Sequence, residues 1–169
     1  PILPEILTGI TPEMQLELMN DKKNSSVSYA QELGTAIHLI LERHLNEAHQ
    51  HRKLVALPDE KTLQTWLKID VKVMNEAFKI VQTILSQAHL RQFFDPTQYL
   101  TAWNELALID ENGKLFKVDR LVELGDKLVI LDYKLNIPEP GSDSMADYEM
   151  QVKHYAQLIS QLRSDKKLE

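Results

Sequence analysis

The sequence has no cysteine among its 169 residues. This absence excludes disulfide bonds, zinc–thiolate sites and cysteine-ligated iron–sulfur clusters. It also fits a reducing compartment, so we expect a cytoplasmic protein. No apolar run approaches the roughly 18 residues of a membrane-spanning helix, and no signal-peptide pattern opens the chain. The net charge of −6 argues against indiscriminate binding to nucleic acid, although it leaves room for a local basic groove.

The composition is that of one globular domain. Hydrophobic residues make up 43% of the chain and charged residues 26%, and the length allows a real core. We expect an N-terminal arm over residues 1–27, with a short helix capped by Thr11, and one domain over residues 28–169. Because the chain begins with Pro1 rather than methionine and stops in the charged stretch "RSDKKLE", we expect a fragment of a larger polypeptide.

Hydrophobic periodicity predicts helices first and strands second. A helix over residues 28–48 is expected to end at the polar stretch "HQHRK". Further helices are predicted from Pro58-Asp59, over 71–90 and over 145–162. Between them the period changes to alternation in "AWNELALID", "KLFKVDRLVEL" and "KLVILDYKL". The fold class is therefore α+β (α/β), with an antiparallel three-stranded meander flanked by helices.

The second hairpin turn predicts that two aspartates meet. Gly125-Asp126 suits a two-residue type II′ loop, because glycine readily adopts the positive φ at its first position. Leu124 then pairs with Lys127, and Asp119 lies opposite Asp132 on the same face. Lys134, two residues beyond Asp132, shares that face at about 7 Å along the strand.

The first hairpin adds a third carboxylate. "DENGK" suits a three-residue loop with Gly113 in the left-handed position, which pairs Asp110 with Lys114 and brings Glu105 opposite Asp119. A two-residue Asn112-Gly113 turn is the alternative, and it would send Glu105 to the other face.

A row of acids destabilises a sheet unless a cation lies there. Like charges about 5 Å apart repel by roughly 3 kcal/mol at an effective dielectric constant near 20. Mg²⁺ or Mn²⁺ prefers such oxygen ligands, and the ammonium of Lys134 could hold a phosphate oxygen or the attacking water. The alternative is a solvated outer face with scattered charges.

These residues resemble the active-site strands of the PD-(D/E)xK nucleases, in particular the RecB-like branch attached to UvrD-type helicases. The resemblance is carried by "VDR…ILDYK", by "GTAIHLILE" (34–42), which is similar to the helical Gly-x-x-x-His segment of that branch, and by "YEMQVKHY", which resembles its Gln-x-x-x-Tyr segment. Glu105 matches an acidic residue on the first strand. The fragments occur in the expected order over residues 34–155.

The resemblance implies a restriction-endonuclease-like core and a metal-dependent, exonuclease-type DNA nuclease acting in recombination and repair, with Mg²⁺ or Mn²⁺ as cofactor. The implied metal ligands are His38, Asp119, Asp132 and the backbone carbonyl of Tyr133. Lys134 is the implied catalytic lysine, and Glu105 joins the catalytic set. Implied partners are DNA, a helicase motor in the same polypeptide and a partner subunit of a helicase–nuclease complex, without a membrane.

Four further residues are expected near the DNA or just behind the metal ligands. Glu42 lies one helical turn after His38 and could orient the site. Arg120 is expected on the face opposite Asp119, as a structural ion-pair residue or a DNA-backbone contact. Gln151 and Tyr155 share a helix face; without the resemblance, they would be a surface glutamine and a core tyrosine.

One departure from the family pattern concerns the end of the chain. The family core has another strand after the Gln/Tyr helix, so we expect that last core strand to be truncated here. The competing hypothesis for function is a catalytically inactive module of the same fold that binds DNA or a partner subunit.

Overall fold

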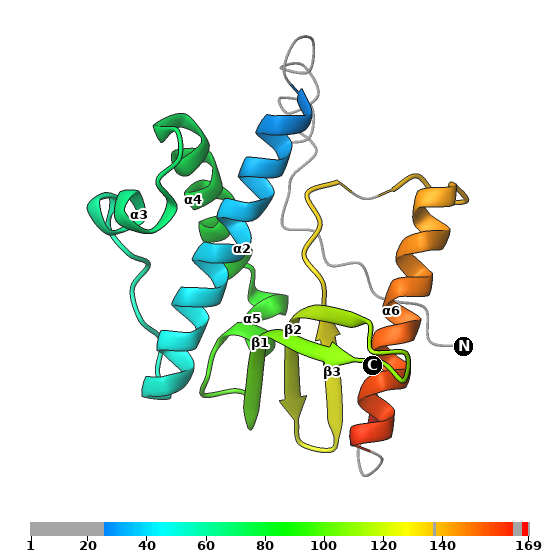
Figure 1. The fold of residues 1–169 in the computed structure, drawn as a ribbon. Coiled ribbons are helices and arrows are strands. Elements are labelled where there is room, and N and C mark those ends of the chain that lie inside the picture. Colours follow the sequence, from blue (N-terminus) through cyan, green and yellow to red (C-terminus); the bar gives the residue numbers. More distant parts are fainter. Residues whose placement is uncertain (1–25, 137, 164–166, 169) are drawn as a thin grey trace.

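The computed structural model describes residues 26–136, 138–163 and 167–168 of the chain (Figure 1). The predicted N-terminal arm lies outside these residues, apart from its last two, which belong to the first helix. That helix, α2 (Ser26–His51), is followed by α3 (Glu60–Leu67) and α4 (Val71–Ser86). A short 3₁₀ turn η1 (Ala88–Leu90) and α5 (Arg91–Phe94) lead into the sheet. None of the helices in the described part of the chain combines the length and apolar character needed to cross a membrane.

The sheet is the predicted antiparallel meander with one short addition. β1 (Thr101–Ile109), β2 (Leu115–Leu124) and β3 (Lys127–Leu131) pair in sequence order. Helix α6 (Asp143–Leu162) follows, capped by the Ser142 side chain, and β4 (Lys167–Leu168) pairs parallel with β3. The resemblance led us to expect a truncated strand after the Gln/Tyr helix, and the described part of β4 consists of two residues at the β3 edge.

Helices cover both faces of the sheet, as Figure 1 shows, with α2, α3 and α4 on one side and α6 on the other. One buried apolar cluster joins α2–α5 to Ala102, Val122, Val129 and Leu131. A second, smaller cluster joins Tyr155, Leu158 and Ile159 of α6 to the other face of the strands. The two clusters fix the sheet between its layers, so that the strand residues between α2 and α6 have defined positions.

The register of each hairpin is set by a turn that contains a glycine with positive φ. Gly113 has φ +80°, and Asp110 N donates to Lys114 O at 3.0 Å, as the three-residue loop requires. Gly125 has φ +54°, and Leu124 pairs with Lys127. The predicted turns are therefore confirmed, and the two-residue alternative for the first hairpin is wrong.

The alternation of faces reverses in the middle of β1 and β2. Leu106 and Val118 belong to the α6 side, whereas Ala102 and Val122 belong to the α2–α5 side. The ladder skips the Glu105–Asp119 position, where Glu105 has φ +54°, between the pairs Asn104–Arg120 and Leu106–Val118. This interruption rotates the strands locally and leaves two carboxylates outside the regular ladder.

Because of this reversal, Arg120 does not lie on the face opposite Asp119. The Asp119 carboxylate contacts His38 of α2, and the Arg120 guanidinium contacts the Phe93 carbonyl of α5, so both point to the α2–α5 layer. The prediction of opposite faces assumed unbroken alternation and was wrong.

Several predicted element boundaries also differ from the structure. Helix α2 begins two residues earlier than predicted and continues through the "HQHRK" stretch to His51. Contacts with the segment before β1 support its last turns: His49 stacks on Tyr99, and Arg52 donates to the Tyr99 and Leu100 carbonyls. The predicted 71–90 helix ends at Ser86 and continues as η1 and α5. Strand β3 stops at Leu131 instead of reaching residue 135.

Candidate metal centre

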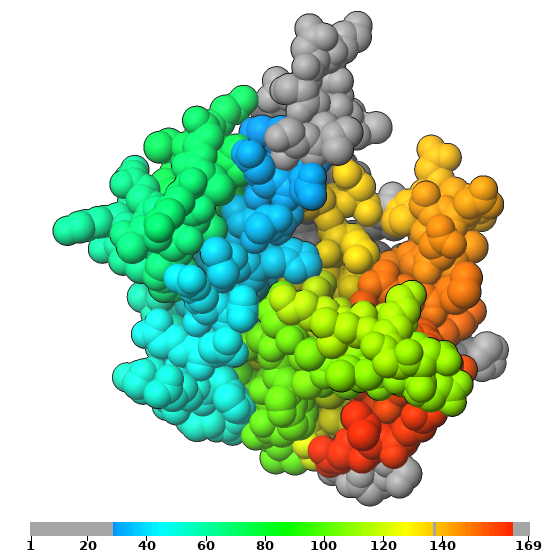
Figure 2. Space-filling view, viewed as in Figure 1, coloured from blue at the N-terminus to red at the C-terminus, as the bar shows by residue number. Residues whose placement is uncertain are grey.

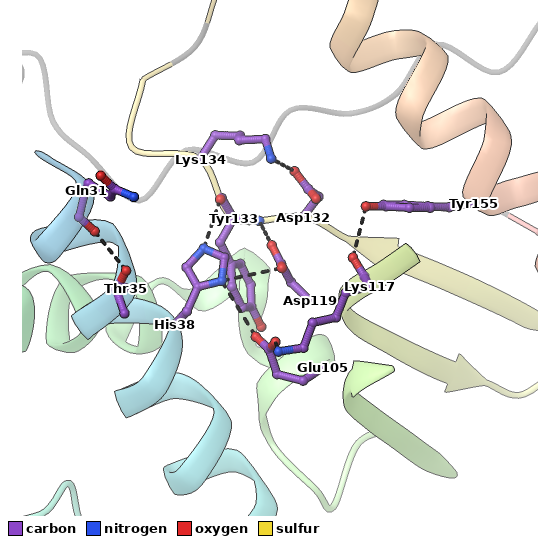
Figure 3. A network of polar contacts seen from close by, with 10 residues as sticks. All are labelled: Gln31, Thr35, His38, Glu105, Lys117, Asp119, Asp132, Tyr133, Lys134 and Tyr155. Carbon is purple, nitrogen blue, oxygen red and sulfur yellow. Dashed lines mark hydrogen bonds and ion pairs between the residues drawn. The ribbon is translucent and has the colours of Figure 1, made fainter. Parts of the chain in front are cut away.

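The site lies where α2 approaches the interrupted part of the sheet (Figure 3). His38 projects from α2 with its Nδ1 3.4 Å from Asp119 Oδ1 and 3.7 Å from Glu105 Oε1. On the other side of the ring, Nε2 lies 3.2 Å from the Tyr133 carbonyl oxygen, to which it donates when protonated. The imidazole therefore lies between two carboxylates and a backbone carbonyl.

The approach of α2 depends on a residue without a side chain. Gly34 lies one turn before His38, and a Cβ at this position would meet the Leu135 side chain at 3.4 Å. The close approach of α2 at Gly34 is therefore to the segment after β3. It brings His38 to the same segment, at Tyr133.

Asp119 is held at both carboxylate oxygens. Its Oδ1 faces His38, and its Oδ2 accepts a 2.6 Å hydrogen bond from the Tyr133 backbone N–H. That N–H would otherwise continue the β2–β3 ladder, so the same bond accounts for the end of β3 at Leu131. Asp119 consequently determines the path of the segment that carries Asp132 and Lys134.

Glu105 reaches the site from a strained backbone position. Positive φ is costly for a residue with a side chain, by roughly 1–2 kcal/mol, and such strain is often found at functional sites. One carboxylate oxygen faces His38, and the other forms an ion pair with Lys117 Nζ. The Glu105 bond and the charges of Glu105, Glu42 and Asp119 outweigh partial burial and raise the pKa of Lys117.

Asp132 lies just beyond β3 and has a different partner. Its side chain is 3% exposed, and its Oδ2 lies 2.7 Å from Lys134 Nζ. Burial raises the pKa of this carboxyl, and the Asp119 charge adds to the effect, while Lys134 and His38 oppose it. Lys134 Nζ also lies 5.5 Å from the centre of the Tyr148 ring, within the range of a cation–π contact.

The acidic surroundings change the protonation of His38. Burial alone would lower its pKa, but the hydrogen bond and charge of Asp119, the Tyr133 carbonyl and the charge of Glu105 raise it. A protonated imidazole partly neutralises the two carboxylates in the absence of another cation. Binding of a metal ion has to displace that proton, because a histidine ligand must be neutral.

The predicted Gln151–Tyr155 pair lies on α6 and acts on β2. Gln151 Nε2 donates to the Tyr155 hydroxyl at 2.5 Å, and that hydroxyl donates to the Lys117 carbonyl at 2.9 Å. Tyr155 is buried in the second apolar cluster. Burial raises the pKa of Tyr155, so it remains a neutral donor. In this structure the pair anchors the backbone two residues before Asp119.

Arg120 and Glu42 differ in their access to the site. Arg120 is fully buried; it donates to the Phe93 carbonyl and to Asn104 Oδ1 and lies over the rings of Phe94 and Tyr99. Of the two predicted roles of Arg120, only the structural one fits this position, because a guanidinium without exposure does not reach a DNA backbone. Its described partners are neutral. Glu42 is half-buried on α2, near enough for its charge to act on Lys117.

Two residues of the site, Lys117 and Tyr148, were not predicted from the sequence. Tyr148 is three residues before Gln151, so helical spacing alone could have placed it on the face of Gln151 and Tyr155. Lys117 precedes Asp119 by two residues in a strand, which places both on one face. Its link to Glu105 depends on the interrupted ladder, for which the sequence has no clear signal.

The donor set fits a divalent cation. Within the described residues, His38, Glu105 and Asp119 offer three ligand atoms that lie within 4.8 Å of one another. Two carboxylates and an imidazole suit Mn²⁺, and the oxygen donors suit Mg²⁺. The Tyr133 carbonyl lies on the Nε2 side of the His38 ring, away from the two carboxylates. Asp132 is not part of this compact group, because Lys134 holds its carboxylate. The predicted ligand set and the observed group therefore share His38 and Asp119 and differ at Glu105 and Asp132.

Comparison with known families agrees with this geometry. No curated protein matches the chain. The sequence profile of the PD-(D/E)XK nuclease superfamily, whose members are generally metal-dependent nucleases, matches residues 13–168. The matched range includes α2, the meander and α6, and thus each of the site residues described above. With a match over most of its length and a mixed fold of the restriction-endonuclease-like type, the chain belongs to the PD-(D/E)XK nuclease superfamily.

Proposed function

We propose that this chain is the RecB-like nuclease domain of a helicase–nuclease and hydrolyses phosphodiester bonds in DNA with Mg²⁺ or Mn²⁺. The observation that carries the proposal is the convergence of His38 from α2, Glu105 from β1 and Asp119 from β2 within 4.8 Å. Two like charges beside each other destabilise a sheet, and His38 and Lys117 offset them only in part. A metal-dependent reaction explains the cluster.

In this proposal, His38, Asp119 and Glu105 would hold the cation, and Asp132 and the Tyr133 carbonyl would complete its ligands. When bound, a divalent cation acts as a Lewis acid on a phosphate oxygen and lowers the pKa of a coordinated water. The hydrogen bond from Tyr133 N–H to Asp119 keeps this carboxylate oriented before any ligand arrives. Such preorganisation avoids the cost of ordering the donors during the reaction.

Lys134 is the proposed catalytic lysine. Its side chain is 40% exposed, and its ammonium is oriented by Asp132 and by the Tyr148 ring. An ammonium in this place contacts a non-bridging oxygen of the scissile phosphate and stabilises the negative charge that develops as water attacks. Asp132 and Tyr148 then act as positioning residues for Lys134.

The biological context follows from the order of the motifs. The Gly-x-x-x-His helix, the acidic hairpins and the Gln-x-x-x-Tyr helix occur in the arrangement of RecB-like domains, which supports an exonuclease-type role in DNA recombination and repair. The 169 residues contain no Gly-rich phosphate loop. Translocation would accordingly be supplied by a helicase motor elsewhere in the same polypeptide, with a partner subunit as a further component.

The test is cleavage of end-labelled single- and double-stranded DNA in Mg²⁺, Mn²⁺ or EDTA, comparing wild type with Asp119→Asn. We expect metal-dependent cleavage to fall by at least about 100-fold in the variant, beyond the 10–100-fold effect typical of residues behind a metal ligand. The matched control is Asp126→Asn, the same change at the exposed turn of the adjoining hairpin. Wild-type protein that binds DNA without cutting it in either metal would identify the inactive binding module instead, and equal losses in both variants would also reject the proposal.

A further inference from the structure

Lys117 has an accessible ammonium at the rim of the donor group. Its side chain is 61% exposed and forms an ion pair with the Glu105 carboxylate, whose other oxygen faces His38. Figure 3 shows Lys117 and Lys134 on either side of Asp119. Figure 2 shows the part of the sheet that contains β1 and β2 on the molecular surface between α2 and α6. Both lysine side chains are accessible, with 61% of Lys117 and 40% of Lys134 exposed.

The backbone of Lys117 is held more firmly than an exposed lysine requires. Tyr155, which is buried, donates its hydroxyl hydrogen bond to the Lys117 carbonyl, and Gln151 donates to that hydroxyl. Lys153 on α6 provides a contrast: it is 69% exposed and pairs with Glu149 one helical turn away. The Gln151–Tyr155 pair therefore fixes the position from which the Lys117 side chain extends.

Charge explains why a lysine is needed there. Three carboxylates, those of Glu105, Asp119 and Asp132, face two ammonium groups, which leaves a formal charge of −1 when His38 is neutral. This charge repels a phosphodiester. A divalent cation engaged by Glu105 would bring the total to +1 and would take the counter-ion away from Lys117. Without Lys117 the loaded site would be neutral and would attract DNA only weakly.

We propose that Lys117 is a second phosphate-binding lysine, which contacts the phosphate next to the scissile one when a divalent cation engages Glu105. This inference rests on the proposed function. In the metal-free protein the Glu105 carboxylate holds the ammonium, so the contact with DNA depends on the metal. Gln151 and Tyr155 act as positioning residues for this contact through the Lys117 carbonyl.

The experiment measures binding of a fluorescent single-stranded oligonucleotide by anisotropy, with Ca²⁺ or with EDTA, for wild type and Lys117→Met. Ca²⁺ is used because it takes the same oxygen ligands and allows equilibrium binding. In Ca²⁺ we expect affinity to fall by roughly three- to tenfold and the slope of log affinity against log salt to decrease in magnitude by about 1, as for the loss of one phosphate contact. In EDTA the substitution changes affinity little. Lys117→Arg retains most of the Ca²⁺-dependent affinity.

The matched control is Lys153→Met, which removes the same charge from an exposed ion pair away from the donor group. Equal losses in the two methionine variants, or a Lys117→Met loss that is the same in EDTA, would overturn the proposal. Cleavage kinetics in Mg²⁺ separate it from the proposed function: Lys117→Met raises KM more than it lowers kcat. A wild-type protein that cleaves DNA while Lys117→Met behaves as Lys153→Met refutes this inference alone. A wild-type protein without metal-dependent cleavage refutes the nuclease function.

Discussion

Asp95, after α5, and Asp132, after β3, have inaccessible carboxylates in two regions of the molecule that differ in the hydrogen-bond donors they provide. Both side chains are nearly inaccessible, with 6% and 3% exposed. Their pKa values nevertheless shift in opposite directions, downward for Asp95 and upward for Asp132. Because burial has the same sign at both positions, the difference comes from the donors that surround each group.

Asp95 has a full set of donors. Its carboxylate accepts hydrogen bonds from the Thr97 backbone N–H, the Thr97 hydroxyl and the Gln98 side chain, and Arg91 lies 3.7 Å away. Burial alone would raise its pKa, but these contacts outweigh it and lower the pKa. The carboxylate closes the turn between α5 and β1 and leaves little capacity for a ligand.

Asp132 has fewer donors. Its Oδ2 forms an ion pair with Lys134 Nζ at 2.7 Å, and among the described residues that atom has no other donor. Burial and the neighbouring Asp119 therefore dominate and raise its pKa. A buried carboxylate that has few hydrogen-bond donors and lies beside other acids is expected where a cation binds. A buried carboxylate with a full set of donors is expected where the side chain only stabilises the fold.

The largest effect on stability is expected from a substitution of Asp95, whose carboxylate has a full set of hydrogen-bond donors. Asp95→Asn removes a charge from several hydrogen bonds and places an amide N–H₂ against other donors, so the free energy of unfolding should fall by about 1–3 kcal/mol. Metal-dependent cleavage by the folded variant should persist. Urea denaturation and DNA cleavage below the melting temperature measure the two effects. An unchanged unfolding free energy would contradict the structural role of Asp95.

Adding the metal should stabilise the other region. If a divalent cation binds the native site, the free energy of unfolding rises by about 1.4 kcal/mol at an ion concentration ten times its dissociation constant. Thermal melting with Mn²⁺ and with EDTA should show this rise in wild type and in Asp95→Asn, a smaller rise in Asp132→Asn, and none in Asp119→Asn. A rise of equal size in all four proteins would place the ion elsewhere.

The smallest expected effect is the pH dependence of the free energy of unfolding, which should differ between Asp132 and Asp95. In EDTA, Asp132→Asn should raise the free energy of unfolding by less than about 1 kcal/mol at neutral pH, because Lys134 already offsets most of the 1–3 kcal/mol cost of desolvating the group. The folded pKa of Asp132 is raised, so its favourable contribution is present below the unfolded pKa of about 3.9 and is lost as the pH rises through the folded value. The gain should therefore vanish in acid.

Asp95 should show the opposite dependence. Its folded pKa is lowered, so its stabilisation is present above the unfolded pKa and is lost as the pH falls through the folded value. Denaturation of wild type and both asparagine variants between pH 3 and pH 7 compares the two. The same sign of pH dependence for both variants would contradict the difference between the regions.

Much of the site was predictable because it depends on local turn chemistry. Gly113 and Gly125 adopt the positive φ that their loops require, and these two turns set both registers. Glu105 and Asp119 accordingly come to neighbouring positions, whereas Asp132 lies outside the compact group. Helical spacing likewise placed Gln151 and Tyr155 together on α6.

The remaining features depend on contacts between distant segments. The strained backbone at Glu105, the end of β3 and the continuation of α2 to His51 are each linked to partners far away in sequence, such as Tyr133 for Asp119 and Tyr99 for His49. Local propensity does not report such contacts. The error for Arg120 has the same origin, because its face was deduced from alternation that the interruption at Glu105 reverses.

Sequence by itself determined the fold class, both hairpin registers and the identity of the acids and the lysine that meet there, because turn geometry and hydrophobic period are properties of short segments. Tertiary structure alone decided which of these groups form the compact donor set and which are paired with lysines. That choice depends on a strained residue, on the approach of α2 past Gly34 and on the hydrogen bond that turns the chain away from β3. Each of these is stabilised by packing between elements, which no local pattern encodes.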